Sequence, residues 1–493
     1  MRKGIMALEE LVEVTHAEPV EVVAVTDESS VENTHAKLQQ SVMEAETANA
    51  DITKAVEVSS ALTEMSNEVE NTLGDGGMSE PQARALEVAI EQMRSSLGAP
   101  RTKTIFPAME GFADTKTRQA KTEIALEGIR EFASKIWEAI KAAIQKAIAW
   151  VMDFVHNLKL NSGALTKRCQ QLMDKAKTMT GGAFAPKAGE TINSTILKKF
   201  LRLAKGETEP GSFAGTLDKH TTLMAKYMGL VDKRIDESCK VVDFAITEID
   251  KIHVSLANVK IGNQTFNSSH DEITVKLLEK LDAFSSGGMS DVSEKSLVSK
   301  YGPDISLNGV PFVFGNDLLV FATIRSGVVK SSPLLISKIG FFVEKRPLPY
   351  DAQEKGVEPM TPEQCVKTLS VVSKHLSAFE SNSSQLNKTI ADLKKAQNTM
   401  FKGITDIQRK TTYFASQTQT AQYKAYGYAH ALVRIVLQMI TTGRSSLQLH
   451  DYSTLKHALS YSAASLAACE RAKETVDEGT TYGGGGKNTP LLN

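Results

Sequence analysis

The sequence predicts a mainly α-helical protein: long amphipathic helices in bundles, a small antiparallel β insert and an acidic, partly disordered N-terminal leader. Three observations support this fold class. Aromatic residues make up only 6% of the 493 residues, which favours long helices over bulky cores. Apolar residues recur at spacings of three and four over long stretches, which is the period of an amphipathic helix. No aromatic residue precedes Phe106, and the chain before it is acidic.

The first 110 residues and the remaining 383 differ sharply in charge. The first part holds 20 Asp and Glu against 8 Lys and Arg, a net charge of −12. The whole chain sums to −1, so the second part must carry +11. Such an asymmetry points to an acidic tail or to a nucleic-acid partner. A cut near residues 106–112 would therefore turn a charge-balanced protein into a basic one.

Residues 1–127 form the acidic leader. The segment 38–66 can form a helix with a thin apolar stripe, made of Val42, Ile52, Val56 and Leu62. Without large side chains, such a helix can bury little area against the entropy lost when the chain becomes ordered. We therefore expect a partly disordered arm here.

Tripeptides that combine a small residue, an apolar residue and glutamate recur in the leader. Among them are Ala85-Leu86-Glu87, Ala108-Met109-Glu110 and Ala125-Leu126-Glu127, and the last two precede Gly111 and Gly128. In an extended, exposed stretch, such a glutamate would suit a protease with a basic subsite for its side chain. Glu110 and Glu127 are the stronger candidates, because they lie where the charge and the aromatic content of the chain change.

Residues 128–160 should form a cationic amphipathic helix. The apolar face consists of Ile129, Phe132, Ile136, Ile140, Ile144, Ile148, Val151 and Val155, widened by Trp137, Ala147, Met152 and Leu158. Lys135, Lys141 and Lys146 lie on the other side. Three interpretations remain: a docking helix of a bundle, a helix at a membrane surface, and a helix that the leader hides until processing exposes it.

The body divides into a helical region (161–300), a β-rich insert (301–350), a C-terminal helical bundle (351–478) and a flexible Gly-rich tail (479–493). A long helix is expected from His220 to Asn258. In the insert, β-prone runs alternate with turns and predict two to four antiparallel strands. Thr361-Pro362-Glu363 is a helix start signal, and further helices are expected at about 420–442 and from Asp451 toward Val476.

The sequence offers little chemistry. It holds no zinc-protease, nucleophile-elbow or dinucleotide-binding motif, so we expect no enzyme and no cofactor or metal. The four cysteines are scattered and are expected to be reduced thiols. No run of 18 apolar residues predicts a transmembrane helix. Gly483 to Lys487 resembles a phosphate loop only superficially, because no strand precedes it and its spacing is wrong.

Basic clusters are candidates for weak, sequence-independent phosphate contacts that salt would weaken. The two clusters selected for this role are Lys198, Lys199 and Arg202, and Lys233 with Arg234. None alternates with stacking aromatic residues as in proteins that bind single strands.

The organisation of the chain resembles the internal head proteins of large tailed bacteriophages, which carry acidic propeptides that a prohead protease removes after a small- or apolar-residue-x-Glu site. The resemblance covers the leader, the two Glu-Gly junctions and the amphipathic helix. It implies a non-enzymatic virion structural protein, cut after Glu110, after Glu127 or after both. It also implies a location inside the capsid, in the host cytoplasm during assembly, with the prohead protease, capsid proteins and genomic DNA as partners.

Two other functions stay open at this point. A membrane-active helical protein of the pore-forming type would use residues 129–158 as its insertion element. A cytosolic helical scaffold would use the acidic leader as an interaction arm.

Overall fold

The computed structural model describes residues 28–98, 112, 114–181, 184–194, 197, 211–257, 279–280, 289–314, 317–325, 338–344, 357–381 and 430–482, with isolated positions between 388 and 402. Everything said below about the structure concerns these residues.

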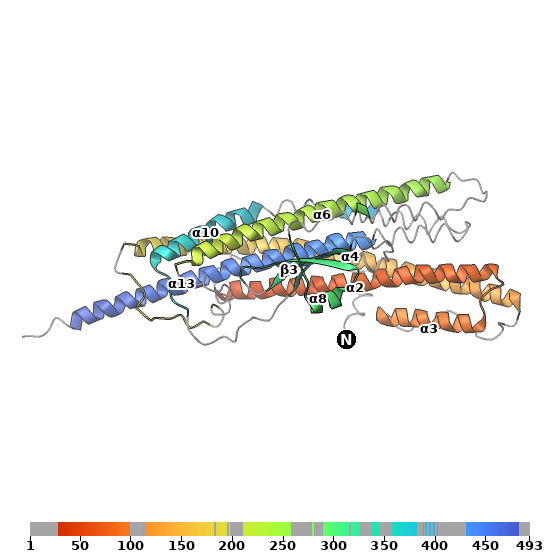
Figure 1. Ribbon diagram of the computed structural model, residues 1–493, viewed down its shortest axis with the longest axis horizontal. Coiled ribbons are helices and arrows are strands. Elements are labelled where there is room, and N and C mark those ends of the chain that lie inside the picture. The colour runs from red at the N-terminus through yellow and green to blue at the C-terminus, as the bar shows by residue number, and fades with distance from the viewer. Residues whose placement is uncertain are drawn as a thin grey trace, which may run out of the picture.

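Long helices lie side by side in an elongated bundle (Figure 1). They are α2 (Glu28–Gly74), α3 (Glu80–Ser96), α4 (Thr115–Met179), α6 (Phe213–Ala257), α10 (Pro362–Ser381) and α13 (Ser445–Tyr482). The mainly helical fold class is thereby confirmed. The helix expected from His220 corresponds to α6, which begins seven residues earlier, at Phe213. At the start of α10, Thr361 and Gln364 bond each other's backbone N–H groups, as the start signal predicted.

The predicted β insert is a four-stranded antiparallel sheet. Its strands are β1 (Ser290–Asp291), β2 (Ile305–Pro311), β3 (Leu318–Ile324) and β4 (Gly340–Glu344), in the order β1-β2-β3-β4. Alternate residues of β3 face opposite sides of the sheet. Leu319 and Phe321 join the main core, whereas Leu318, Val320 and Ala322 pack with the short helix α8 (Lys295–Tyr301). The sheet therefore lies between the bundle and α8.

Helix α4 is the central element of the bundle. It packs most extensively against α2 and next against α10. All eight residues of its predicted apolar face are buried, as expected both for a docking helix of a bundle and for a helix that the leader covers. Met152 was assigned to that face wrongly: 45% of it is exposed, because it lies beyond the edge of the buried stripe. The helix has an Asp114 cap, whose carboxylate accepts a hydrogen bond from the Thr117 N–H at 2.9 Å.

The boundaries predicted at residues 127/128 and 160/161 both lie inside α4. The helix runs through them because no proline interrupts it and because its buried side chains continue past Ser162-Gly163, from Leu158 to Leu165. Gly163 is an ordinary position within the helix, and a Cβ placed there would meet nothing within 4 Å.

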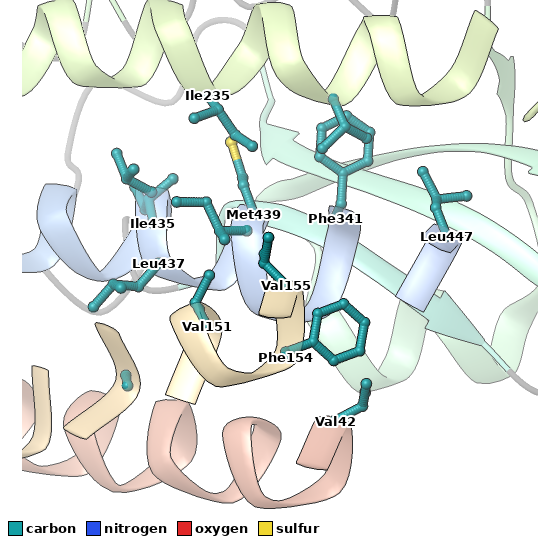
Figure 2. Packing of buried hydrophobic residues seen from close by; sticks show 14 of the residues in the cluster. Val42, Val151, Phe154, Val155, Ile235, Phe341, Ile435, Leu437, Met439 and Leu447 are labelled. Atoms are coloured by element: carbon teal, nitrogen blue, oxygen red, sulfur yellow. The ribbon is translucent and has the colours of Figure 1, made fainter. Parts of the chain in front are cut away.

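Helix α2 belongs to the same core as α4. The predicted stripe is fully integrated: Val42, Ile52, Val56 and Leu62 are each at most 7% exposed. Figure 2 shows Val42 of α2 directly beneath Phe154 of α4, within one layer of side chains that reaches Met439 and Ile235. The helix predicted for residues 38–66 is thus present and longer than expected. The expectation that it buries little area was wrong, because length compensates for small side chains.

A π-helical turn interrupts the C-terminal helix. Residues 430–438 are α-helical, η2 (Met439–Arg444) is a π-helix, and α13 continues directly from it. From residue 430 on, the two helices predicted at 420–442 and from 451 are therefore joined, since Gly443 is accommodated in the wide turn rather than ending the helix; residues 420–429 lie outside the described part of the chain. A Cβ at Gly443 would lie 2.8 Å from Cβ of Phe341, so the glycine permits close packing on β4.

Candidate functional site: the interface of α2 with the bundle

The predicted cut after Glu110 falls in a stretch bounded by two packed segments. Ala108, Met109, Glu110 and Gly111 lie outside the described residues. Before them, α3 ends at Ser96. After them, the Phe112 ring is buried and lies 4.5 Å from Nζ of Lys121. The bundle therefore holds the chain on both sides of the stretch 99–111.

The second predicted cut lies in a different environment. Ala125, Leu126, Glu127 and Gly128 all belong to α4. Ala125 and Leu126 are 0% and 4% exposed, and only the Glu127 side chain of this tripeptide faces solvent. Proteases cut most readily at exposed, extended segments. Cleavage after Glu127 would thus require α4 to unwind here, whereas Glu110 precedes the first residue of α4, Thr115, in the sequence.

An apolar seam runs along most of α2. Its larger buried side chains are Leu38, Val42, Ile52, Val56, Val58, Leu62 and Val69. At roughly 1.5–3 kcal/mol for each fully buried Val, Leu or Ile, these side chains contribute on the order of 10–20 kcal/mol, an upper bound before the cost of ordering the helix. Association of two separate chains costs about 4–15 kcal/mol. The seam is therefore of the same order as the cost of association, before the cost of ordering the helix is counted.

Polar contacts fix the register of α2 against the C-terminal helix. Asn49, which is 4% exposed, donates a hydrogen bond from Nδ2 to Oγ1 of Thr441 in η2. Arg434 is 6% exposed, and burial lowers the pKa of its guanidinium to about 10. The negative charge of Glu57 on α2 acts in the opposite direction and raises this pKa. The acidic helix α2 thus places a carboxylate where its charge favours the charged form of the buried Arg434 guanidinium.

The turn between α2 and α3 rests on the first turns of α4. Gly77 has a φ of +89°, and a Cβ on it would lie 2.5 Å from the carbonyl carbon of Arg118. The backbone N–H of Met78 donates a hydrogen bond to Oγ1 of Thr122 at 2.9 Å. Farther along, the guanidinium of Arg94 on α3 lies 5.0 Å from the ring centre of Phe132. Both leader helices therefore contact α4.

The residues predicted to contact phosphate differ in their exposure in the structure. Lys198, Lys199 and Arg202 lie outside the described residues. The Lys233 side chain is 68% exposed, and its Nζ is 4.0 Å from Oε1 of Glu237. Arg234 is a correction: it is only 3% exposed, pairs with Glu237 and lies 6.0 Å from the Phe321 ring centre. It faces the interior because the amphipathic period of α6 places position 234 beside Ile235 on the buried side, so it is not available to a phosphate in this fold.

A buried polar cluster that sequence reasoning missed connects α6, α10 and α13. Asp451 is 0% exposed, and its carboxylate lies 2.7 Å from Nε2 of His375 and 3.6 Å from Nε2 of His220. Burial opposes ionisation of Asp451, but its interactions with His220 and His375 outweigh burial and lower its pKa. Burial also lowers the pKa of His450 to about 3, aided by His220, and its ring stacks on Phe312 at 4.2 Å.

No signal in the sequence marks this cluster, because its members come from three helices far apart along the chain. Among the described residues, no group of three or more His, Cys, Asp and Glu side chains has an arrangement that could hold a metal ion. The cluster is best understood as a polar contact between helices.

Comparisons with known proteins identify the family. Neither the curated proteins nor the solved structures contain a match. Within the part of the chain that the structure describes, no helix combines the length and apolar character needed to cross a membrane. The model of a family described as phiKZ-like phage internal head proteins matches residues 31–288, a stretch that begins inside α2 and extends beyond α6. The match covers more than half of the chain, which therefore belongs to the phiKZ-like phage internal head proteins, structural proteins located inside the capsid of the virion.

Proposed function

We propose that this internal head protein is made as a precursor that a prohead protease cuts after Glu110. The basic remainder then associates with the genome or with the inner surface of the capsid, and no catalytic step is involved. The observation that carries the proposal is the charge asymmetry: residues 1–110 carry −12 and residues 111–493 carry +11. The Ala-Met-Glu-Gly sequence lies at this boundary, between α3 and α4.

The charge has a direct consequence for contact with DNA. While the acidic segment is attached, the protein is nearly neutral and its attraction to phosphate is weak. Once the segment is lost, the remainder attracts DNA without sequence preference, and the affinity falls steeply as salt rises. The acidic segment thus keeps the precursor soluble and delays contact with the genome.

The burial of residues 125–126 favours Glu110 over Glu127 as the processing site. Glu127 remains a second proposed site, used only where α4 is unwound. Cleavage at either site leaves the same mature charge, because residues 111–127 hold three bases and three acids.

The intact mass and N-terminus of the protein isolated from virions test this proposal. We expect a new terminus at Gly111, and a terminus at Gly128 would shift the assignment to Glu127. A chain that begins at Met1 or Arg2 would contradict processing at both sites.

Substitution identifies the glutamate that the protease recognises. The double variant Glu110→Gln and Glu127→Gln should leave the precursor uncut in infected cells. Glu380→Gln is the matched control, because Ala378-Phe379-Glu380 has the same tripeptide form but lies in α10. Normal processing of the double variant would refute the site assignment.

A further inference from the structure

We infer that a cut between α3 and α4 does not release the α2–α3 segment (residues 28–98), which stays bound to the bundle as a non-covalent partner. The inference rests on the proposed function only in taking the stretch 99–111 as the place of the cut. Processing and the change in charge are then separate events.

The first argument is the distribution of buried contacts. Buried Leu, Val and Ile side chains occur along α2 from Leu38 to Val69, and they share one core cluster with α4 and the C-terminal helix. On α3, Ala83, Leu86 and Ile90 are buried as well. None of these side chains belongs to the stretch 99–111. A cut there breaks one peptide bond and leaves the apolar seam complete.

The second argument is that the polar contacts are specific to this pairing. If α2 left, Asn49 would no longer donate to Thr441 in η2, and the buried Arg434 would lose the favourable charge of Glu57. Leaving buried polar and charged groups without such compensation is unfavourable. The bundle therefore discriminates in favour of its own α2 segment over a generic apolar helix.

The third argument concerns the other end of the segment. Gly77 lies against the Arg118 backbone, and Met78 is hydrogen-bonded to Thr122, so the α2–α3 turn is fixed on the start of α4. Arg94 on the Phe132 ring adds a contact near the end of α3. The segment is thus held at its turn as well as along its length, and a nick close to α3 leaves both attachments intact.

Release then needs a second step that acts on α2 or α3 themselves. A nicked molecule that keeps its acidic segment keeps the charge of the whole chain, which is −1 apart from the new termini. Its affinity for DNA should match that of the precursor. Further proteolysis inside the segment, for example after Glu87 in α3, would remove the acidic helices piecewise and expose the positive charge.

An engineered cut tests the inference on the full chain without the prohead protease. A recognition sequence for a site-specific protease replaces residues 103–108, and the purified protein is cleaved to completion. Size-exclusion chromatography and native mass spectrometry then measure whether the fragments separate on dilution from micromolar to nanomolar concentration. We expect one species with the mass of both fragments across this range. Two separate species at micromolar concentration would overturn the inference.

Two variants show whether the α2 seam is responsible. Ile52→Asp with Leu62→Asp places charges at two positions that are 0% exposed, and the nicked variant should release its segment. Met43→Asp is the matched control on the same helix, where the residue is 67% exposed, and it should be retained like the unchanged protein. Retention of the double variant, or release of the control, would contradict the assigned contacts. Circular dichroism of both uncut variants verifies that the bundle is folded.

Failure of this inference and failure of the proposed processing are distinguishable. If virion protein begins at Met1 or Arg2 but the engineered nick leaves the fragments together, only the processing proposal fails. If virion protein begins at Gly111 but the engineered fragments separate, only the retention of the segment fails.

Discussion

Helices α2 and α4 pack against each other and share one core, but they achieve burial with different side chains. The buried face of α4 includes Phe132, Trp137 and Phe154, together with a row of isoleucines. The buried face of α2 has no aromatic residue and, apart from the polar Asn49 and Ser59, consists of Leu, Val, Ile and Ala. At 47 residues, α2 is about 70 Å long. Small side chains allow close approach of the helix axes, so many modest contacts replace a few large ones.

The comparison also concerns charge. The acidic residues of the first 110 positions suggested a solvated arm, but the net charge of a segment says nothing about its buried face. In α2, the carboxylates lie mostly away from the seam, and Glu57 acts on a buried arginine. An acidic segment can thus be an integral helix of the fold at the same time.

The largest effect is expected from truncating an aromatic residue of α4. Phe154→Ala removes a ring that is 1% exposed and lies between α2 and the C-terminal helix (Figure 2). We expect the free energy of unfolding to fall by about 3–5 kcal/mol. Denaturant titration of the purified protein measures it. A loss below about 1 kcal/mol would mean that this layer of the core is not packed as described.

Low pH should destabilise the bundle through the buried polar cluster around Asp451, which is not part of the apolar seam of α2. His450 has a folded pKa of about 3, below its unfolded value of about 6.5. Its contribution to stability is therefore complete above pH 6.5 and is lost as the pH falls toward 3, by up to about 1.4 kcal/mol per pH unit. The lowered pKa of Asp451 adds a loss of the same sign in acid.

The variant His450→Gln tests this assignment through the slope of stability against pH. Between pH 6.5 and 4 the slope should be flatter than in the unchanged protein. Met43→Ala, which replaces a non-titrating residue that is 67% exposed, is the control and should leave the slope unchanged. Equal slopes for all three proteins would contradict the role of the buried histidine.

The next effect tests whether α2 contributes as a true core helix. Leu62→Ala removes a side chain that is 0% exposed, and we expect a loss of about 2–4 kcal/mol in the free energy of unfolding. Met43→Ala on the same helix, at 67% exposure, should change it by less than about 0.5 kcal/mol. Equal losses in the free energy of unfolding for the two variants would mean that α2 is a peripheral arm and would contradict its assignment to the same core as α4.

A smaller effect is expected at the α2–α3 turn. Gly77→Ala combines a positive φ with a collision against the Arg118 backbone, at a cost of about 1–3 kcal/mol. Gly74→Ala is the control, since a Cβ there meets nothing within 4 Å. Thermal unfolding of the two variants should differ, with Gly77→Ala melting at the lower temperature.

The smallest effect concerns the hydrogen bond between α2 and η2. Asn49→Ala should cost about 1 kcal/mol, because Thr441 keeps a second bond to the Leu437 carbonyl. Gln40→Ala, which removes an exposed bond to Glu44, should cost almost nothing. A double variant with Thr441→Val measures the coupling energy, and a value of zero would show that the two side chains do not interact.

Large apolar residues made α4 and the sheet predictable from the sequence, while smaller features depended on distant partners. The stripe on α2 was visible, but its burial depends on Phe154 and on the C-terminal helix, which lie far along the chain. The π-turn was not predictable either, since Gly443 ordinarily signals an end to a helix. Its accommodation depends on close packing against Phe341 of β4.

The candidate site was predictable in part for the same reason. The charge boundary and the Glu-Gly junctions can be seen directly in the sequence, and they locate the proposed cut. The environment of the second junction depends on tertiary packing, which places Glu127 inside α4. Arg234 was predicted to contact phosphate, but it is buried in the structure, where it pairs with Glu237 and lies beside the Phe321 ring. The cluster around Asp451 joins three helices and left no local pattern.

Hydrogen–deuterium exchange of the intact protein tests most directly whether the acidic α2 is an integral helix of the bundle. Amide protection reports the free energy of opening each segment. We expect the amides of residues 38–69 in α2 to be protected to a similar degree as those of residues 129–158 in α4. Rapid exchange throughout α2, with α4 still protected, would contradict the account.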